Sequence, residues 1–190
     1  FALGHKREGD IHRLVELQPD LGYELRVIPP VQLNGHIVSS SRIRGLLRDG
    51  QVGEAAQALG RWYQLIGQVI PVDGRGRTLG IPTANLLLPP EKMIPDAGVY
   101  ACIARSGELV YPAAVNIGYR PTFDGSVAEP QVEAHLIGFH GDLYQQQLSL
   151  QFISRLRGEK RCDSIQALVE QIRADINRTK ELVDTHILIK

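Results

Sequence analysis

The sequence has few of the features that define membrane proteins, zinc proteins or disulfide-rich proteins. Its 190 residues contain two cysteines, Cys102 and Cys162, which lie far apart with no C-x-x-C pair, so neither a zinc site nor a disulfide framework is predicted. No apolar run approaches the roughly 20 residues that cross a bilayer, and no signal-peptide pattern is present. The composition predicts a cytoplasmic protein with reduced thiols and no membrane association.

Excess charge of either sign is also missing. Lysine plus arginine and aspartate plus glutamate balance at 21 each, so no overall field attracts nucleic acid, and any anion site must be local. The hydrophobic content of 43% is enough for a sizeable core. The chain opens on Phe1 rather than on methionine, which predicts a fragment of a longer protein.

The first 60 residues have the pattern of an α/β unit. A short helix is predicted over 11–17 and a strand over 23–28, which a proline pair ends. A serine caps a second helix that runs to Gly50, and a third helix over 54–59 leads to Gly60. We place a domain boundary there, with domains over 1–60 and 61–190.

Hydroxyls and arginines gather at the start of the second helix. Ser39, Ser40 and Arg44 lie where free backbone N–H groups and the helix dipole favour an anion. The alternative is an ordinary capped surface helix with solvated arginines, which the residues alone favour.

From Trp62 onward the pattern changes to short alternating segments separated by turn residues. Strands are predicted over 65–70, 98–104, 109–117, 132–139 and 148–153, a spacing that indicates an antiparallel barrel or sandwich. Apolar residues recur at helical spacing from Ser164 to about Val183, and this helix is expected to pack on the strands.

The stretch over 72–85 combines glycines and arginines with a Pro-Thr-Ala-Asn corner. Glycine backbone and arginine side chains suit phosphate groups, and Thr83 and Asn85 offer hard oxygen ligands for a Mg²⁺ otherwise held by nucleotide phosphates. The stretch matches neither a Walker loop nor a Rossmann fingerprint. The alternative is a plain Gly/Arg-rich hairpin followed by a strand. The residues that we assign to phosphate binding in this loop are Gly74, Arg75, Gly76, Arg77 and Gly80.

Three further positions carry candidate chemistry. Glu133 and His135 share one face of a strand, and a carboxylate there could be a general base or an exposed surface residue. Asn116 stands near a strand end, where it either lines a pocket or satisfies turn backbone. Arg157 either reaches a ligand or neutralises Glu159.

Taken together, six ordered motifs resemble the riboflavin kinase module of bacterial bifunctional riboflavin kinase/FMN adenylyltransferases, from about Leu59 to the C-terminus. The motifs are GRGRTLGIPTAN from Gly74, GVY from Gly98, NIGYRPT from Asn116, VEAHL from Val132, GDLY from Gly141 and LRGE from Leu156. Residues 1–60 resemble the end of the adenylyltransferase module, whose early His-x-Gly-His motif does not occur in this sequence. That module is implied to precede the chain in the parent protein, where it makes FAD.

The resemblance implies a six-stranded antiparallel Greek-key barrel with a C-terminal helix, preceded by a partial nucleotidyltransferase-like α/β segment. It implies transfer of the γ-phosphoryl group of MgATP to the 5′-hydroxyl of riboflavin, giving FMN and ADP. By the same carry-over Thr83 and Asn85 bind Mg²⁺ and ATP, and Glu133 is the catalytic base. Tyr144 contacts ATP, Arg157 and Asn116 lie on the flavin side, and Ser39, Ser40 and Arg44 form a remnant phosphate site.

The sequence departs from the family at three positions. Val72 and Gln145 stand where the family usually has glycine, and Cys162 stands where it usually has phenylalanine. Val72 and Cys162 leave one alternative from another class, a flavin- and nucleotide-binding module without catalysis.

Overall fold

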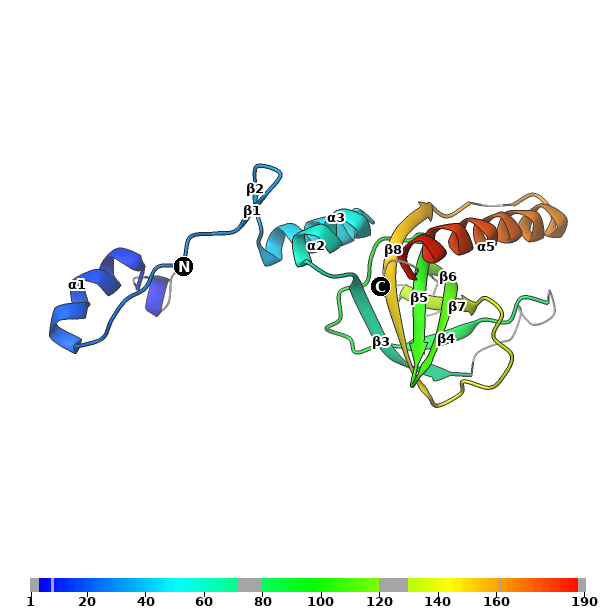
Figure 1. Cartoon of the computed structure of the whole chain (residues 1–190), viewed down its shortest axis with the longest axis horizontal. Coiled ribbons are helices and arrows are strands. Elements are labelled where there is room, and N and C mark those ends of the chain that lie inside the picture. The colour runs from blue at the N-terminus through cyan, green and yellow to red at the C-terminus, as the bar shows by residue number, and fades with distance from the viewer. Residues whose placement is uncertain (1–3, 8, 72–79, 120–129, 161, 188–190) are drawn as a thin grey trace. The chain divides into compact units, whose positions relative to one another are not determined.

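The computed structural model describes residues 4–7, 9–71, 80–119, 130–160 and 162–187, and their contacts divide the chain into two compact units, 1–38 and 39–190. Figure 1 shows the barrel that dominates the second unit. Within the described ranges, no helix is both long and apolar enough to span a membrane.

The first unit contains short elements. They are η1 (His5–Arg7), α1 (Ile11–Leu21), β1 (Gln32–Leu33) and β2 (His36–Ile37). The Asp10 carboxylate caps α1 by accepting a hydrogen bond from the backbone N–H of Arg13 at 2.9 Å, and Gly22 ends the helix at φ 69°. Asn34 and Gly35, both at positive φ, form the turn between β1 and β2.

The predicted strand over 23–28 is wrong, because the described residues of this segment form no regular structure. Alternation along a segment favours an extended backbone, but a strand also needs a partner for its N–H and C=O groups. Here Tyr23 instead bonds the carbonyl of Leu14 through its hydroxyl, and Val27 and Ile28 are exposed.

The second unit begins with the two helices that the capping residues predicted, α2 (Ser40–Arg48) and α3 (Val52–Leu59). The Ser39 hydroxyl accepts a hydrogen bond from the Arg42 N–H at 3.3 Å. Gly50 and Gly60 take positive φ after the helix ends, as residues without a Cβ do readily. α3 packs on β3 and β8 of the barrel.

Six antiparallel strands close into the barrel, in the order β3-β4-β7-β6-β5-β8. β5, β6 and β7 follow one another, and β8 returns beside β5, which is a Greek key. The predicted barrel class is therefore confirmed. Strand bounds are β3 (Tyr63–Ile70), β4 (Ala84–Leu87), β5 (Gly98–Ser106), β6 (Leu109–Tyr119), β7 (Pro130–Leu136) and β8 (Gln147–Arg157).

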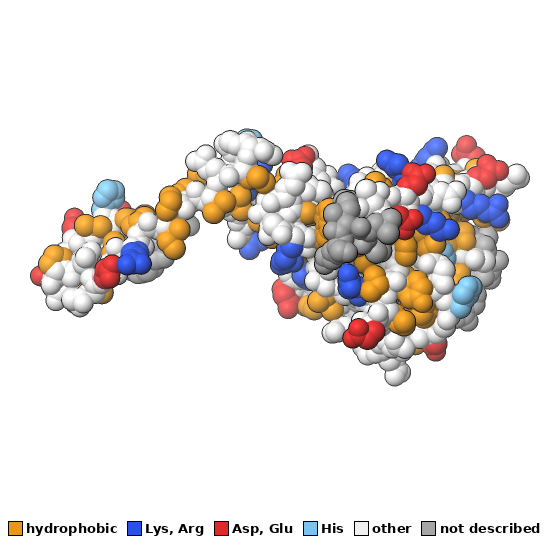
Figure 2. All heavy atoms as spheres, in the orientation of Figure 1, with side chains coloured by type: hydrophobic (Ala, Val, Ile, Leu, Met, Phe, Trp, Pro, Cys, Tyr) orange, Lys and Arg blue, Asp and Glu red, His pale blue; other side chains and the backbone are white. Residues whose placement is uncertain are grey.

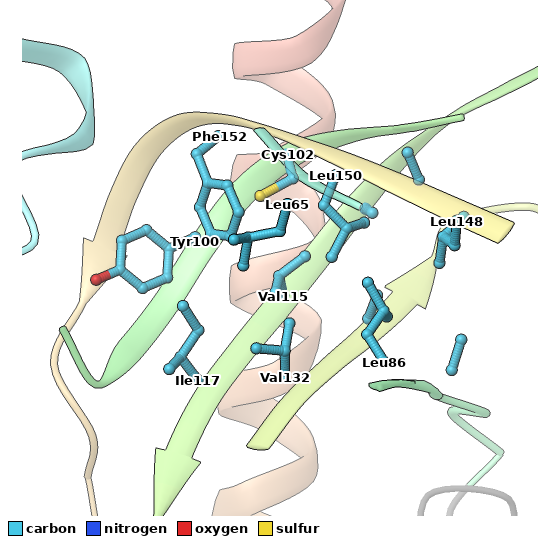
Figure 3. Close-up of a cluster of buried hydrophobic side chains, with 14 of the residues drawn as sticks. Leu65, Leu86, Tyr100, Cys102, Val115, Ile117, Val132, Leu148, Leu150 and Phe152 are labelled. Carbon is cyan, nitrogen blue, oxygen red and sulfur yellow. The ribbon is translucent and has the colours of Figure 1, made fainter. Parts of the chain in front are cut away.

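The barrel interior is filled by apolar side chains from all six strands (Figure 3). At one end the rings of Tyr100 and Phe152 meet edge to face, with centroids 5.3 Å apart. Burial raises the pKa of Tyr100 to about 12, so its hydroxyl keeps its proton and donates to the carbonyl of Asp96. Leu46, Leu47, Val52 and Ala55 of α2 and α3 belong to the same cluster as the barrel residues.

The C-terminal helix α5 (Ile165–Ile187) packs across β5, β6 and β8. The Ser164 hydroxyl accepts a hydrogen bond from the Ala167 N–H at 3.1 Å and caps the first turn of the helix. Basic and acidic side chains are interspersed along α5 on the face seen in Figure 2. Its other side covers the outer face of the barrel, where Val183 is buried with Ile103 and Ile153.

The division into packed units at Val38 does not coincide with the predicted domain boundary at Gly60. α2 and α3 pack with the barrel because their apolar faces complete its core. Packing and domain origin are separate properties, so the assignment of residues 1–60 to an adenylyltransferase module stays a prediction.

Candidate active site

A row of polar side chains crosses the outer face of the barrel. In the sheet register Glu133 of β7 stands opposite Asn85 of β4 on one side and opposite Asn116 of β6 on the other. Directly opposite residues of an antiparallel pair point to the same face. Their neighbours Val132 and Ala134 are buried in the core, so this row faces outward.

A cavity of about 330 Å³ opens on this outer face, between the barrel and α5. Four predicted site residues from four separate motifs line it: Thr83, Asn116, Glu133 and Arg157. Sequence reasoning placed them in one site only through the family resemblance, and the fold brings them together. The full lining is Ile81, Thr83, Val99, Ala114, Asn116, Glu133, His135, Arg157, Glu159, Lys160, Leu168, Ile172 and Asp175.

Arg157 stands at the end of β8, which continues beyond the predicted limit at Ile153. Its guanidinium pairs with Asp175 of α5, with Nη2 at 2.8 Å from Oδ2 and Nε at 3.2 Å from Oδ1. The Asp175 side chain is only 9% exposed. This bidentate pair ties the helix to the strand and fixes the guanidinium at the cavity wall.

Asp175 is a site residue that sequence reasoning missed. It lies on the α5 face that packs on the barrel, three positions after Ile172 and four before the buried Thr179. The sequence signal that could have identified Asp175 is its position as a carboxylate on an otherwise apolar face of the helix. Because α5 also carries many exposed charged residues, the sequence alone did not distinguish Asp175 from them.

A second cavity of about 330 Å³ adjoins the first. It is lined by Tyr144 together with Pro82, Phe139, His140 and Asp142, among others. Thr83 lines both cavities. The predicted ATP contact Tyr144 therefore lines a different cavity from Glu133 and Arg157, and Thr83 is common to both.

Tyr144 is held in a turn in which the Asp142 carboxylate accepts from its backbone N–H at 2.8 Å. The next residue, Gln145, takes φ 63°. A residue with a Cβ is strained there by about 1 kcal/mol or more, which gives a physical reason for the glycine that the family usually has at this position.

Asn85, the other predicted metal ligand, is placed differently from Thr83. It lines a third cavity, of about 440 Å³, with residues that include Ile70, Pro130 and Gln131. The structure thus brings Asn85 next to Glu133 across the sheet but does not place it in the cavity wall beside Thr83.

Most of the predicted phosphate loop lies outside the described residues. The residues concerned are Gly74, Arg75, Gly76 and Arg77. Gly80, the last member, is described and takes φ 72°, a conformation for which glycine is favoured.

The predicted remnant phosphate residues lie at the start of α2. Ser39 is the N-cap, and Ser40 and Arg44 are exposed in the first turns. They belong to the same unit as the barrel but line none of the three cavities described above.

Among the described residues no group of three or more His, Cys, Asp or Glu side chains could hold a metal ion. A transition-metal centre is therefore not supported by the described part of the chain. The Thr83 hydroxyl and the Asn85 amide are hard, uncharged oxygen donors. Such donors suit a Mg²⁺ that takes its other ligands from water and substrate phosphates.

Comparison with known proteins places these features in one family. The riboflavin kinase family model matches residues 59–183. The chain is 34% identical over 182 residues to the bifunctional riboflavin kinase/FMN adenylyltransferase of Pseudomonas fluorescens, covering 96% of this chain and 58% of that protein. It is 40% identical over 139 residues to the protein of the same name from Bacillus subtilis, covering 73% of this chain and 44% of that one.

A solved structure is similar over nearly the whole chain. It is titled a macrolide-efflux protein from Streptococcus pneumoniae and aligns with a TM-score of 0.84 and 32% identity, covering 95% of this chain and 57% of that chain. This chain therefore spans less than two thirds of the length of these relatives. Because the kinase family model matches more than half of it and contains the cavity-lining motifs, the chain belongs to the riboflavin kinase family.

Proposed function

We propose that the chain transfers the γ-phosphoryl group of MgATP to the 5′-hydroxyl of riboflavin, giving FMN and ADP. One observation carries the proposal: Thr83 lies at the junction of two adjacent cavities, one with Glu133 and Arg157 and the other with Tyr144. Phosphoryl transfer needs donor and acceptor sites that meet where the phosphoryl group passes.

Glu133 is the proposed general base. Its side chain is half-buried in the cavity wall and comes from a strand whose other face is core. A carboxylate fixed on a rigid strand can accept the proton of the ribityl hydroxyl as its oxygen attacks phosphorus. The rigidity matters because catalysis depends on the alignment of the attacking oxygen.

The cavity beneath α5 suits a flavin. Its walls combine apolar side chains, among them Val99, Leu168 and Ile172, with the polar ends of Asn116 and Arg157. Apolar walls with a few fixed polar groups are typical of sites for planar organic ligands. We assign riboflavin to this cavity and the nucleotide to the neighbouring one.

Thr83 and Asn85 are the proposed protein ligands of Mg²⁺. When bound with ATP, the ion would neutralise charge on the transferring phosphoryl group. The task of the chain is then to hold the Thr83 hydroxyl at the junction of the cavities and Asn85 beside Glu133. Arg75 and Arg77, which lie outside the described residues, are proposed to contact the phosphates with the glycines of the same loop.

The names of the relatives also include FMN adenylyltransferase. We propose that a longer protein containing this chain makes FAD from FMN, with Ser39, Ser40 and Arg44 at the start of α2 binding the nucleotide phosphates. The chain alone, which lacks a His-x-Gly-His motif, is proposed to have no adenylyltransferase activity. The protein is further proposed to be cytoplasmic and to bind no nucleic acid.

Incubation with riboflavin, ATP and Mg²⁺, with FMN and FAD separated by chromatography, tests the proposal. FMN without FAD is the expected product. Flavin binding without FMN formation would favour a non-catalytic binding module instead. FAD formation by this chain would overturn the assignment of its two segments.

A further inference from the structure

The backbone ladder between β4 and β7 is short at the point where Thr83 lies. Only Ala84 with Ala134 and Asn85 with Glu133 are paired. Continuing the register would place Thr83 opposite His135, but β4 begins at Ala84. Pro82 has no N–H to donate to β7, so a regular ladder cannot continue through it. The corner that carries Thr83 needs another anchor.

His135 supplies that anchor. Its Nδ1 lies 2.8 Å from the carbonyl oxygen of Pro82. A carbonyl oxygen only accepts hydrogen bonds, so Nδ1 must carry the hydrogen, and the hydrogen bond selects that tautomer of a neutral ring. His135 and Thr83 also line the same cavity.

We infer that His135 is a positioning residue whose Nδ1–H holds the Pro82–Thr83 corner against β7, and thereby holds the Thr83 hydroxyl at the junction of the two cavities. The inference rests on the proposed function for its consequence in phosphoryl transfer. The hydrogen bond joins the strand of Glu133 to the corner of Thr83, so it sets the distance between base and metal ligand.

Donation from Nδ1 to the Pro82 carbonyl leaves Nε2 as the unprotonated ring nitrogen. A positioning role and a role in proton transfer are therefore separated by substitution. A positioning role requires only a donor at the place of Nδ1. A role in proton transfer would require the imidazole itself.

The tautomer can be measured without any kinase activity. In the intact chain, ¹⁵N NMR of histidine at mildly alkaline pH, with the His135 signals assigned by their loss in His135→Asn, should show hydrogen on Nδ1. Hydrogen on Nε2 would overturn the inference.

Two substitutions then test the consequence. Asparagine places an amide N–H near the position of Nδ1, whereas glutamine places one near Nε2. The magnesium concentration for half-maximal riboflavin phosphorylation should stay within about threefold of wild type in His135→Asn and rise about tenfold in His135→Gln, the size expected for one lost hydrogen bond.

His36→Gln, in the exposed β1–β2 hairpin, is the matched control and should behave as wild type. Equal effects of Asn and Gln at position 135 would overturn the positioning role, as would a fall in kcat with no change in magnesium dependence. If a variant does not fold, the tautomer measurement on the wild-type chain still decides. If the wild-type chain forms no FMN, the proposed function fails while the tautomer result stands on its own.

Discussion

At the scale of single residues, the proposed roles in metal binding, proton transfer and flavin binding belong to side chains that lie far apart in the sequence. Thr83 and Asn85 lie two positions apart, yet they line different cavities, one shared with Glu133 and the other with Gln131. The two proposed magnesium ligands therefore differ in what surrounds them, and their contributions can be separated by substitution.

Thr83→Val keeps the shape of the side chain and removes its oxygen, so the magnesium concentration for half-maximal activity should rise about tenfold or more. Asn85→Leu should have a similar effect if both residues bind the ion. Thr185→Val, on the exposed side of α5, controls for loss of a hydroxyl and should change nothing. An unchanged magnesium dependence in Asn85→Leu would remove Asn85 from the ligand set.

Site residues that lie in a family motif could be predicted from the sequence, whereas a residue identified only by its packing could not. Glu133 and Thr83 stand in motifs that resemble a known family, so their roles could be predicted. Asp175 has no motif, since one aspartate in a charged helix is usually solvated. Only the packing of α5 on β8 shows that it pairs with Arg157.

At the scale of elements, α5 forms one wall of the cavity that we propose for riboflavin, and the Arg157–Asp175 pair ties the helix to the barrel. Leu168 and Ile172 of the same helix line the cavity. The position of the helix and the position of the guanidinium are therefore coupled. A substitution that weakens the ion pair should alter the cavity wall formed by Leu168 and Ile172.

Asp175→Asn removes the charge and keeps the shape, leaving a partly buried guanidinium with a weaker partner. We expect a loss of about 1–3 kcal/mol in stability and a rise of about tenfold in the KM for riboflavin. The KM for MgATP should be nearly unchanged because neither Asp175 nor Arg157 lines the cavity proposed for the nucleotide. Thermal unfolding and separate titrations of the two substrates measure these quantities.

Asp184→Asn makes the same substitution at an exposed position of α5 and should match wild type. A riboflavin KM unaffected by Asp175→Asn would show that the pair holds the helix without shaping the cavity.

Element prediction succeeded where capping and alternation agreed. Ser39, Gly60 and Ser164 fixed helix ends, and the long strands β5 and β6 have clear alternation or burial. β4 has only four residues, too few for a periodic signal. The segment over 23–28 alternates but has no partner strand in the described chain, which alternation alone cannot reveal.

At the scale of the whole molecule, the family match and the packing place the start of the kinase domain at different residues. The match begins at residue 59, whereas the compact unit that contains the barrel begins at Ser39. The difference is the pair α2 and α3, which fill part of the barrel cluster with apolar side chains.

Truncation tests which limit governs folding. A chain over 39–190 should unfold at nearly the same temperature as the full chain, because it keeps the whole cluster. A chain over 61–190 should lose at least about 4 kcal/mol, since Leu46, Leu47 and Val52 each contribute about 1.5–3 kcal/mol when buried. Denaturant unfolding of both chains measures the difference, and equal stabilities would contradict the role assigned to the two helices.

The central claim is that the cavity between the barrel and α5 is the site of phosphoryl transfer, with Glu133 as its base. The most direct test is the kcat for FMN formation by Glu133→Gln, compared with Glu108→Gln in the exposed β5–β6 turn. Loss of a positioned base predicts a fall of roughly 10²–10⁴-fold with unchanged unfolding, and no fall in the control. A Glu133→Gln chain that phosphorylates riboflavin at the wild-type rate would contradict the mechanism.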